Sequence, residues 1–142
     1  MAEFIFRDLA ARRGMAEQFE VASCATSGEE IYDGVGNPVY PPAREELARH
    51  GLRCGGKRAR RLTREDYSRW DLLIGMDEEN MRSMARMLGG DPEGKLRKLM
   101  DFTARGGDVA DPWYTGRFDV TYRDVLDGCE GLLNTLTKEE NA

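Results

Sequence analysis

The chain has 142 residues, a length that fits one compact domain over residues 1–142 with a single core. Acidic residues outnumber basic ones by 26 to 21, and the formal charge of −5 argues against a general nucleic-acid or membrane-surface binder. Three scattered cysteines and one histidine argue against a disulfide framework and a Cys/His zinc site, so we expect no metal and no cofactor.

The front half of the chain predicts two helices separated by a strand and a long loop. Apolar residues at helical spacing predict a helix over 2–13. A strand is expected over 20–27, followed by a loop rich in Gly and Pro over 28–42. Pro41 suits the first turn of a second helix, which reaches about His50.

The rear half alternates helices with strands. A capped helix is expected over 63–70, and the Leu-Leu-Ile run within 71–76 is typical of a buried parallel strand. Acidic residues open the next helix, 77–88, where they complement its positive end rather than bind a metal. The remaining predictions are a weaker strand over 96–102, a loop over 108–118 and an amphipathic helix over 121–137.

This alternation predicts an α/β domain with three layers, in which a small parallel sheet is covered by helices on both faces. Such a sheet normally opens with a strand whose following loop leads into the first helix. Here the first helix begins with the chain itself, so we expect the first and central strand of the sheet to be missing.

Five short motifs, in a fixed order, carry a resemblance to a known family. The most specific is the acidic segment Val109-Ala110-Asp111-Pro112-Trp113-Tyr114-Thr115-Gly116. The others are Met1-Ala2-Glu3-Phe4, Ser23-Cys24-Ala25-Thr26-Ser27, Gly36-Asn37-Pro38-Val39-Tyr40 and Met76-Asp77-Glu78-Glu79-Asn80. Each falls where the predicted elements place a loop or a helix start, and together the chain resembles the low-molecular-weight protein tyrosine phosphatases over nearly its whole length.

The resemblance implies hydrolysis of phosphotyrosine in proteins, or of another aryl phosphate, through a phosphocysteine. In the family, a loop of Cys, five residues, Arg and Ser holds the phosphate at a helix amino end, just before the residues matching Met1-Ala2-Glu3-Phe4. That loop is absent here, so we expect the chain as given to be inactive. The alternative is a catalytically dead module that binds phosphotyrosine or a partner, and the upstream coding sequence would separate the two.

By resemblance, Asp111 protonates the tyrosine leaving oxygen and later activates water. Taken alone, an Asp before Pro is typical of a surface turn. Tyr32 and Trp113 resemble the aromatic walls of a slot for a phenyl ring, while Tyr114 is either a wall or a packing residue. Two further residues resemble supports of the phosphate loop and the strand ends, Ser23 and Asn80.

The stretch from Cys54 to Arg60 also spaces a cysteine and an arginine by five residues. We interpret this match as accidental, because a helix end precedes Cys54 and Arg61 follows where Ser or Thr is expected. Family members often carry a histidine where Lys57 stands. The basic run 57–61 has no interleaved aromatic residue, so nucleic-acid binding is not expected.

Arsenate reduction on the same fold is not expected, because it needs further cysteines near the helix over 77–89 to relay a disulfide, and none lies there. The apolar stretches are too short for a membrane span and no leader is visible, which favours a cytoplasmic protein. A sheet without its central strand would lose several buried side chains, so we expect the fragment to be marginally stable, aggregation-prone, or completed by a partner strand through a dimer or strand exchange.

Overall fold

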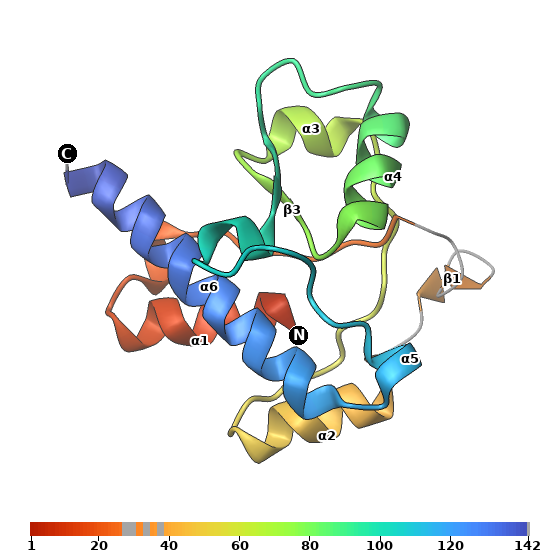
Figure 1. Ribbon diagram of the computed structural model, residues 1–142, viewed down its shortest axis with the longest axis vertical. Coiled ribbons are helices and arrows are strands. Elements are labelled where there is room, and N and C mark those ends of the chain that lie inside the picture. The colour runs from red at the N-terminus through yellow and green to blue at the C-terminus, as the bar shows by residue number, and fades with distance from the viewer. Residues whose placement is uncertain (27–30, 33–34, 37–38, 142) are drawn as a thin grey trace.

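The computed structural model describes residues 1–26, 31–32, 35–36 and 39–141, without the side chains of residues 31, 32, 35, 36, 113, 114 and 139–141. In this part of the chain, helices surround a small parallel sheet, and a separate hairpin stands at one side (Figure 1). The predicted α/β class is confirmed.

The parallel sheet consists of β3 (Leu73–Gly75) and β4 (Leu96–Lys98). Their register pairs Leu73 with Leu96 and Gly75 with Lys98, so both strands end at the same edge. The connecting helix α4 (Glu78–Leu88) ends at Gly89, whose φ of 75° is the left-handed conformation that glycine adopts without strain.

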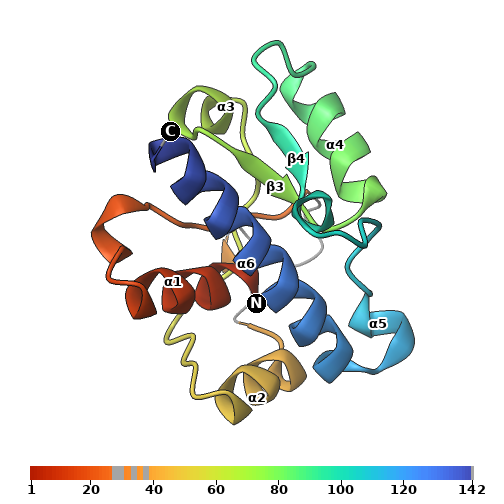
Figure 2. The ribbon, with the colours of Figure 1, turned by 60° about the vertical axis from the view of Figure 1, so that its left-hand side comes forward.

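Two hydrophobic clusters lie on opposite faces of this sheet, because side chains alternate along a strand. Leu73 packs in one cluster with Leu62 and Met84 of α4. The neighbouring Leu72 and Ile74 pack against the larger cluster. Figure 2 shows β3 and β4 between α4 and the long helix α6 (Phe118–Asn141). The covered sheet agrees with the predicted layers.

Helix α6 organises the larger cluster. It contacts α1 (Ala2–Arg12), α2 (Pro41–Arg49) and the short 3-10 helix η2 (Leu99–Phe102). The approach of η2 is close at Gly131, where an added Cβ would meet the carbonyl oxygen of Phe102. The most deeply buried side chains of the cluster are Ile5, Leu47, Leu99, Met100, Cys129 and Leu133.

The prediction of a strand over 20–27 is wrong for residues 20–26, which are the part that the structure describes. Residues 19–24 belong to no strand, and the segment makes a single parallel bridge between Ala25 and Arg61. Pairing, rather than apolar sequence alone, decides whether a segment becomes a strand. The predicted loop after it contains a short antiparallel hairpin of β1 (Ile31–Tyr32) and β2 (Val35–Gly36). Residues 27–30, 33–34 and 37–38 of this region lie outside the described residues.

Element boundaries differ in the rear half. The strand predicted over 96–102 ends at Lys98, where the chain turns into η2, and the last helix begins at Phe118 rather than Thr121. The remaining short helices are η1 (Ala16–Gln18), α3 (Glu65–Arg69) and α5 (Pro112–Thr115). Of the helices that are described, none is long and apolar enough to cross a membrane.

Candidate active site

The loop that carries Asp111 is fixed to two separate elements before it reaches that residue. The Val109 amide donates to the Met76 carbonyl, just beyond the end of β3, at 2.9 Å. The Ala110 amide donates to the Asp124 carboxylate of α6 at 3.2 Å, and the Ala110 carbonyl accepts from the Thr121 hydroxyl at 2.8 Å. Asp111 itself is exposed and opens α5, since its carbonyl accepts from the Thr115 amide at 3.3 Å.

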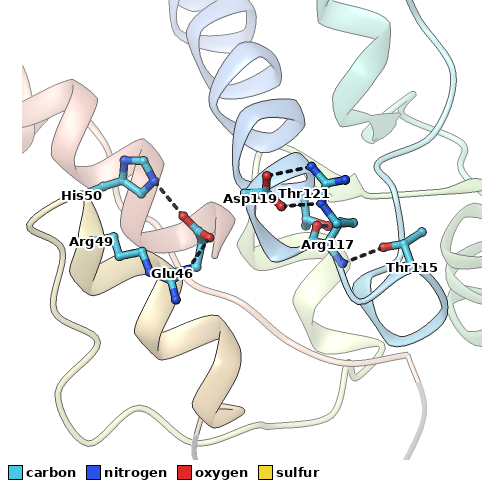
Figure 3. A network of polar contacts seen from close by, with 7 residues as sticks. All are labelled: Glu46, Arg49, His50, Thr115, Arg117, Asp119 and Thr121. Carbon is cyan, nitrogen blue, oxygen red and sulfur yellow. Dashed lines mark hydrogen bonds and ion pairs between the residues drawn. The ribbon is translucent and has the colours of Figure 1, made fainter.

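The far side of the same loop is closed by polar contacts at the junction of α5 and α6, which Figure 3 shows. The Arg117 amide donates to the Thr115 hydroxyl at 3.1 Å, and the Arg117 guanidinium makes two hydrogen bonds of 3.0 Å to Asp119. These bonds from Arg117 lower the pKa of the Asp119 carboxyl to about 2. Asp111 therefore lies on a short loop whose two ends are fixed by hydrogen bonds.

Asn80 holds the end of β3 to the start of α4. Asp77 caps α4 by accepting from the Asn80 amide at 2.7 Å, and the Asn80 side-chain oxygen accepts from the Met76 amide at 3.0 Å. Met76 thus binds Asn80 through its amide and the Asp111 loop, at Val109, through its carbonyl. The predicted capping role of Asp77 is confirmed. Asn80 lies at the end of β3, and its role as a support of the phosphate loop stays a prediction.

Ser23 lies in a different cluster. Its hydroxyl donates to the Glu3 carboxylate at 2.9 Å, and the Lys57 ammonium lies 2.8 Å from the same oxygen. Arg7 approaches the second Glu3 oxygen to 3.0 Å, but its N–H does not point at that oxygen, so the contact is an ion pair without a hydrogen bond. Ser23 is therefore fixed to the first turn of α1 through Glu3.

The environment of Glu3 favours its charged form. Burial of this residue, which is only 4% exposed, raises the pKa of the carboxyl. The hydrogen bonds from Lys57 and Ser23, together with the charges of Lys57 and Arg7, outweigh burial and set the pKa below its ordinary value. Lys57 therefore acts as the partner of a buried carboxylate.

The predicted aromatic walls are placed only by their backbones. Tyr32 is in β1, and Trp113 and Tyr114 are in α5, but their side chains lie outside the described residues. Figure 1 shows the hairpin and α5 on the same side of the molecule. The slot itself remains a prediction.

The stretch from Cys54 to Arg60 does not form a phosphate-binding loop. Cys54 begins a turn, in which the Lys57 amide donates to its carbonyl, and the next helix starts only at Glu65. The Arg60 guanidinium binds both oxygens of the Asp66 carboxylate at 3.1 Å. The turn and the pairing of Arg60 with Asp66 support the interpretation of this match as accidental.

The other two thiols do not resemble an activated nucleophile. Desolvation outweighs the nearby Arg60 charge and raises the pKa of the Cys24 thiol. Burial raises the pKa of the Cys129 thiol to about 12, in the middle of α6. Within the described part of the chain, no group of three or more His, Cys, Asp or Glu residues is arranged to hold a metal ion.

Sequence reasoning missed the residues that fix the Asp111 loop from outside its motif. Lys98 at the end of β4 binds Glu78 at 2.8 Å and Asp108 at 3.0 Å. Asp124, which is 5% exposed, binds the Ala110 amide and also Arg105. The sequence does contain a sign of this role for Lys98. A lysine within a predicted buried strand needs an oppositely charged partner, because unpaired lysines are almost never fully buried.

Comparisons with known proteins agree with this geometry. The sequence pattern of the family described as "Low molecular weight phosphotyrosine protein phosphatase" matches residues 1–142. The chain is 36% identical over 142 residues to the low molecular weight protein-tyrosine-phosphatase YfkJ of Bacillus subtilis, covering 99% of this chain and 88% of that protein. It is 30% identical to the human low molecular weight phosphotyrosine protein phosphatase, covering 94% of this chain and 84% of the human one.

Solved structures extend the comparison to the fold. The crystal structure of YfkJ from Bacillus subtilis matches with a TM-score of 0.90 at 35% identity, over 97% of this chain and 86% of that chain. A protein tyrosine phosphatase from Entamoeba histolytica matches with a TM-score of 0.86 at 20% identity, over 98% of this chain and 88% of that chain, and so shares the fold. The chain belongs to the low molecular weight phosphotyrosine protein phosphatase family.

Proposed function

We propose that this protein hydrolyses phosphotyrosine, with Asp111 as the proton donor to the tyrosine oxygen, when a Cys, five residues, Arg, Ser loop stands ahead of α1. The observation that carries the proposal is the anchoring of the Asp111 loop to Met76 and α6. A general acid contributes only if it is held within hydrogen-bond reach of the leaving oxygen, and the bonds that fix this loop on two sides support such a role for Asp111.

The substrate class follows from the aromatic residues around this loop. Tyr32 and Trp113 would form the walls of a slot for the phenyl ring, and Tyr114 would be a third wall or a packing residue. Support comes from the hairpin that contains Tyr32, which stands on the same side of the molecule as α5 (Figure 1). A deep, narrow aromatic slot lets the phosphate of a phosphotyrosine reach the acid, whereas the side chain of phosphoserine is too short to place its phosphate at that depth.

The two supporting residues act on different elements. Asn80 fixes the strand end to which the Asp111 loop is bonded. Ser23 acts through Glu3 on the first turn of α1. That turn presents the helix amino end where the family binds its phosphate.

We further propose that the 142 residues alone do not turn over substrate. The sequence has three cysteines, of which Cys54 lies in a turn and Cys129 lies inside α6. Cys24 has no arginine six residues later. A phosphocysteine route needs a thiolate cradled by amides and an arginine, and none of the three has this setting among the residues that the structure describes.

The test is a pair of proteins, the chain as given and the same chain joined to a strand and a Cys, five residues, Arg, Ser loop ahead of Met1. We expect the first to release no nitrophenol from p-nitrophenyl phosphate, with or without Cys54→Ser. The second is expected to be active, and Asp111→Asn to lower its kcat by about 10²- to 10⁴-fold. The exposed Asp101 of η2 provides the control variant, Asp101→Asn, which should leave kcat unchanged.

A rate for the chain as given that Cys54→Ser abolishes would contradict the proposal. So would an Asp111→Asn variant of the joined protein with full activity.

The absence of a poised thiol also favours an alternative, a module that binds phosphotyrosine or a partner without hydrolysis. Titration of the chain as given with a phosphotyrosine peptide and its unphosphorylated form separates the two. Phosphate-dependent binding together with an inactive joined protein would favour the module, whereas an active joined protein favours the enzyme.

The sheet offers a place for a partner strand. Among the described residues, β3 pairs with β4 on one side only. We propose that a second copy, by dimerisation or strand exchange, completes this edge. Sedimentation equilibrium tests this proposal, and a stable monomer at all concentrations would contradict it.

A further inference from the structure

Lys98 occupies an unusual position at the end of the parallel sheet. It is the last residue of β4 and pairs in register with Gly75 of β3, yet it is only 8% exposed. Lysine is almost never this deeply buried unless an opposite charge compensates it. A specific partner is therefore required.

Two carboxylates from different segments meet the Lys98 ammonium. Glu78 of α4 lies 2.8 Å away, and Asp108 of the Asp111 loop lies 3.0 Å away. Both carboxylates are half exposed, whereas the lysine side chain is only 11% exposed. The hydrogen bonds to Glu78 and Asp108 raise the pKa of the ammonium, which stays charged throughout the physiological range.

This clamp, formed by Lys98, Glu78 and Asp108, bears directly on the Asp111 loop. Asp108 is followed by Val109 and Ala110, whose amides bind Met76 and Asp124. Without the ammonium, the Glu78 and Asp108 carboxylates would face each other as like charges, which pushes the loop away from α4.

We propose that Lys98 is a positioning residue for the Asp111 loop, which it fixes by drawing Asp108 to the carboxyl ends of the two parallel strands. The inference rests on the proposed function, in which Asp111 is the proton donor. Lys98 touches neither substrate nor the reacting atoms in this proposal. It acts through the backbone of residues 108–111.

The chain supplies a matched control at the other end of the same strand. The side chain of Lys95 is 15% exposed, and its ammonium donates to the Tyr67 carbonyl at 2.6 Å. Lys95 is therefore a similarly buried lysine with a bonded ammonium, but its short bond is to a neutral carbonyl, and it lies just before β4, away from the clamp. A general loss of stability should appear in the variants of both lysines, whereas an effect specific to the Asp111 loop should appear only in the Lys98 variant.

The experiment is amide hydrogen exchange by NMR on the chain as it is, with Val109 and Ala110 compared with the core amide of Leu133. We expect Lys98→Met to speed exchange at Val109 and Ala110 by about 10-fold relative to Leu133, since a charge-assisted bond is lost. Lys98→Arg should restore most of the protection, because it keeps the charge. Lys95→Met should leave the ratio of loop to core exchange unchanged.

An unchanged ratio in Lys98→Met, or an equal effect of Lys95→Met, overturns the proposal. If Lys98→Met does not fold, Asp108→Asn replaces it. That variant removes the clamp from the loop side, and normal protection of Val109 in it also overturns the proposal. Exchange does not depend on turnover, so a failure of Asp111 as proton donor in the activity test is recognised separately.

Discussion

Replacing Glu3 by Gln tests whether a buried carboxylate holds the front of the molecule together. The side chain of Glu3 is only 2% exposed. It forms ion pairs with Lys57 and Arg7 and accepts a hydrogen bond from Ser23, and these three residues come from different segments. Gln keeps the size and one acceptor oxygen but removes the charge. Lys57, whose side chain is 28% exposed, then loses its counter-charge in a setting that water reaches only in part.

The magnitude follows from this partial exposure. Breaking a fully buried ion pair destabilises a protein by about 3 to 5 kcal/mol. Because Lys57 and Arg7 retain some contact with water, we expect Glu3→Gln to lower the free energy of unfolding by about 2 to 3 kcal/mol. The control is Glu20→Gln, which breaks the Arg69–Glu20 pair, where the two side chains are 61% and 70% exposed. That exposed pair should contribute less than about 1 kcal/mol.

Urea denaturation of both variants, followed by circular dichroism, gives the two free energies, and Lys57→Met completes a double-mutant cycle with Glu3→Gln. The lowered pKa of Glu3 adds a pH signature. Its contribution is fully present above the ordinary value of 4.5 and is lost as pH falls through the lower folded-state pKa. Equal losses in the Glu3 and Glu20 variants at pH 7 would refute the reasoning.

Two further predictions concern α6. Gly131→Ala should destabilise the protein by about 1 to 3 kcal/mol in urea titrations, because the new Cβ meets the Phe102 carbonyl oxygen and the clash exceeds the gain in helix propensity; a more stable variant would contradict this contact. Asp119→Asn should remove a contribution that is present above the ordinary pKa of 3.8 and is lost as pH falls towards about 2. Unfolding curves of wild type and Asp119→Asn should therefore converge at the acid end, and parallel curves down to pH 2 would contradict the role of Arg117.

Local patterns predicted what depends on neighbours in sequence. The spacing of apolar residues gave α1 to within a residue, and the acidic start of α4 gave Asp77 as its cap. The rejection of Cys54 as a nucleophile also rested on local context, namely a helix end before it and Arg61 after the matching arginine.

Long-range contacts account for what the sequence did not show. Glu3 looks like an acidic residue that complements the start of a helix, but the fold buries it against Lys57 and Ser23. The segment near Val21 has strand-like residues, yet among the described residues its pairing is limited to one bridge at Ala25. Whether a charge is buried, or an edge is paired, depends on segments that no local window contains.

The motif and its anchors therefore carry different kinds of information. Asp111 is predicted as the proton donor from the residues around it, but the bonds that fix Asp108, Val109 and Ala110 come from Met76, from α6 and from Lys98, all outside the motif. A proton donor must be held to within a fraction of an ångström to be effective, and its motif alone cannot supply that constraint. If Asp111 is the proton donor as proposed, a variant that keeps Asp111 but loses both Lys98 and Asp124 should keep the motif and lose much of the rate contributed by general acid catalysis, which kcat on p-nitrophenyl phosphate of the joined protein measures.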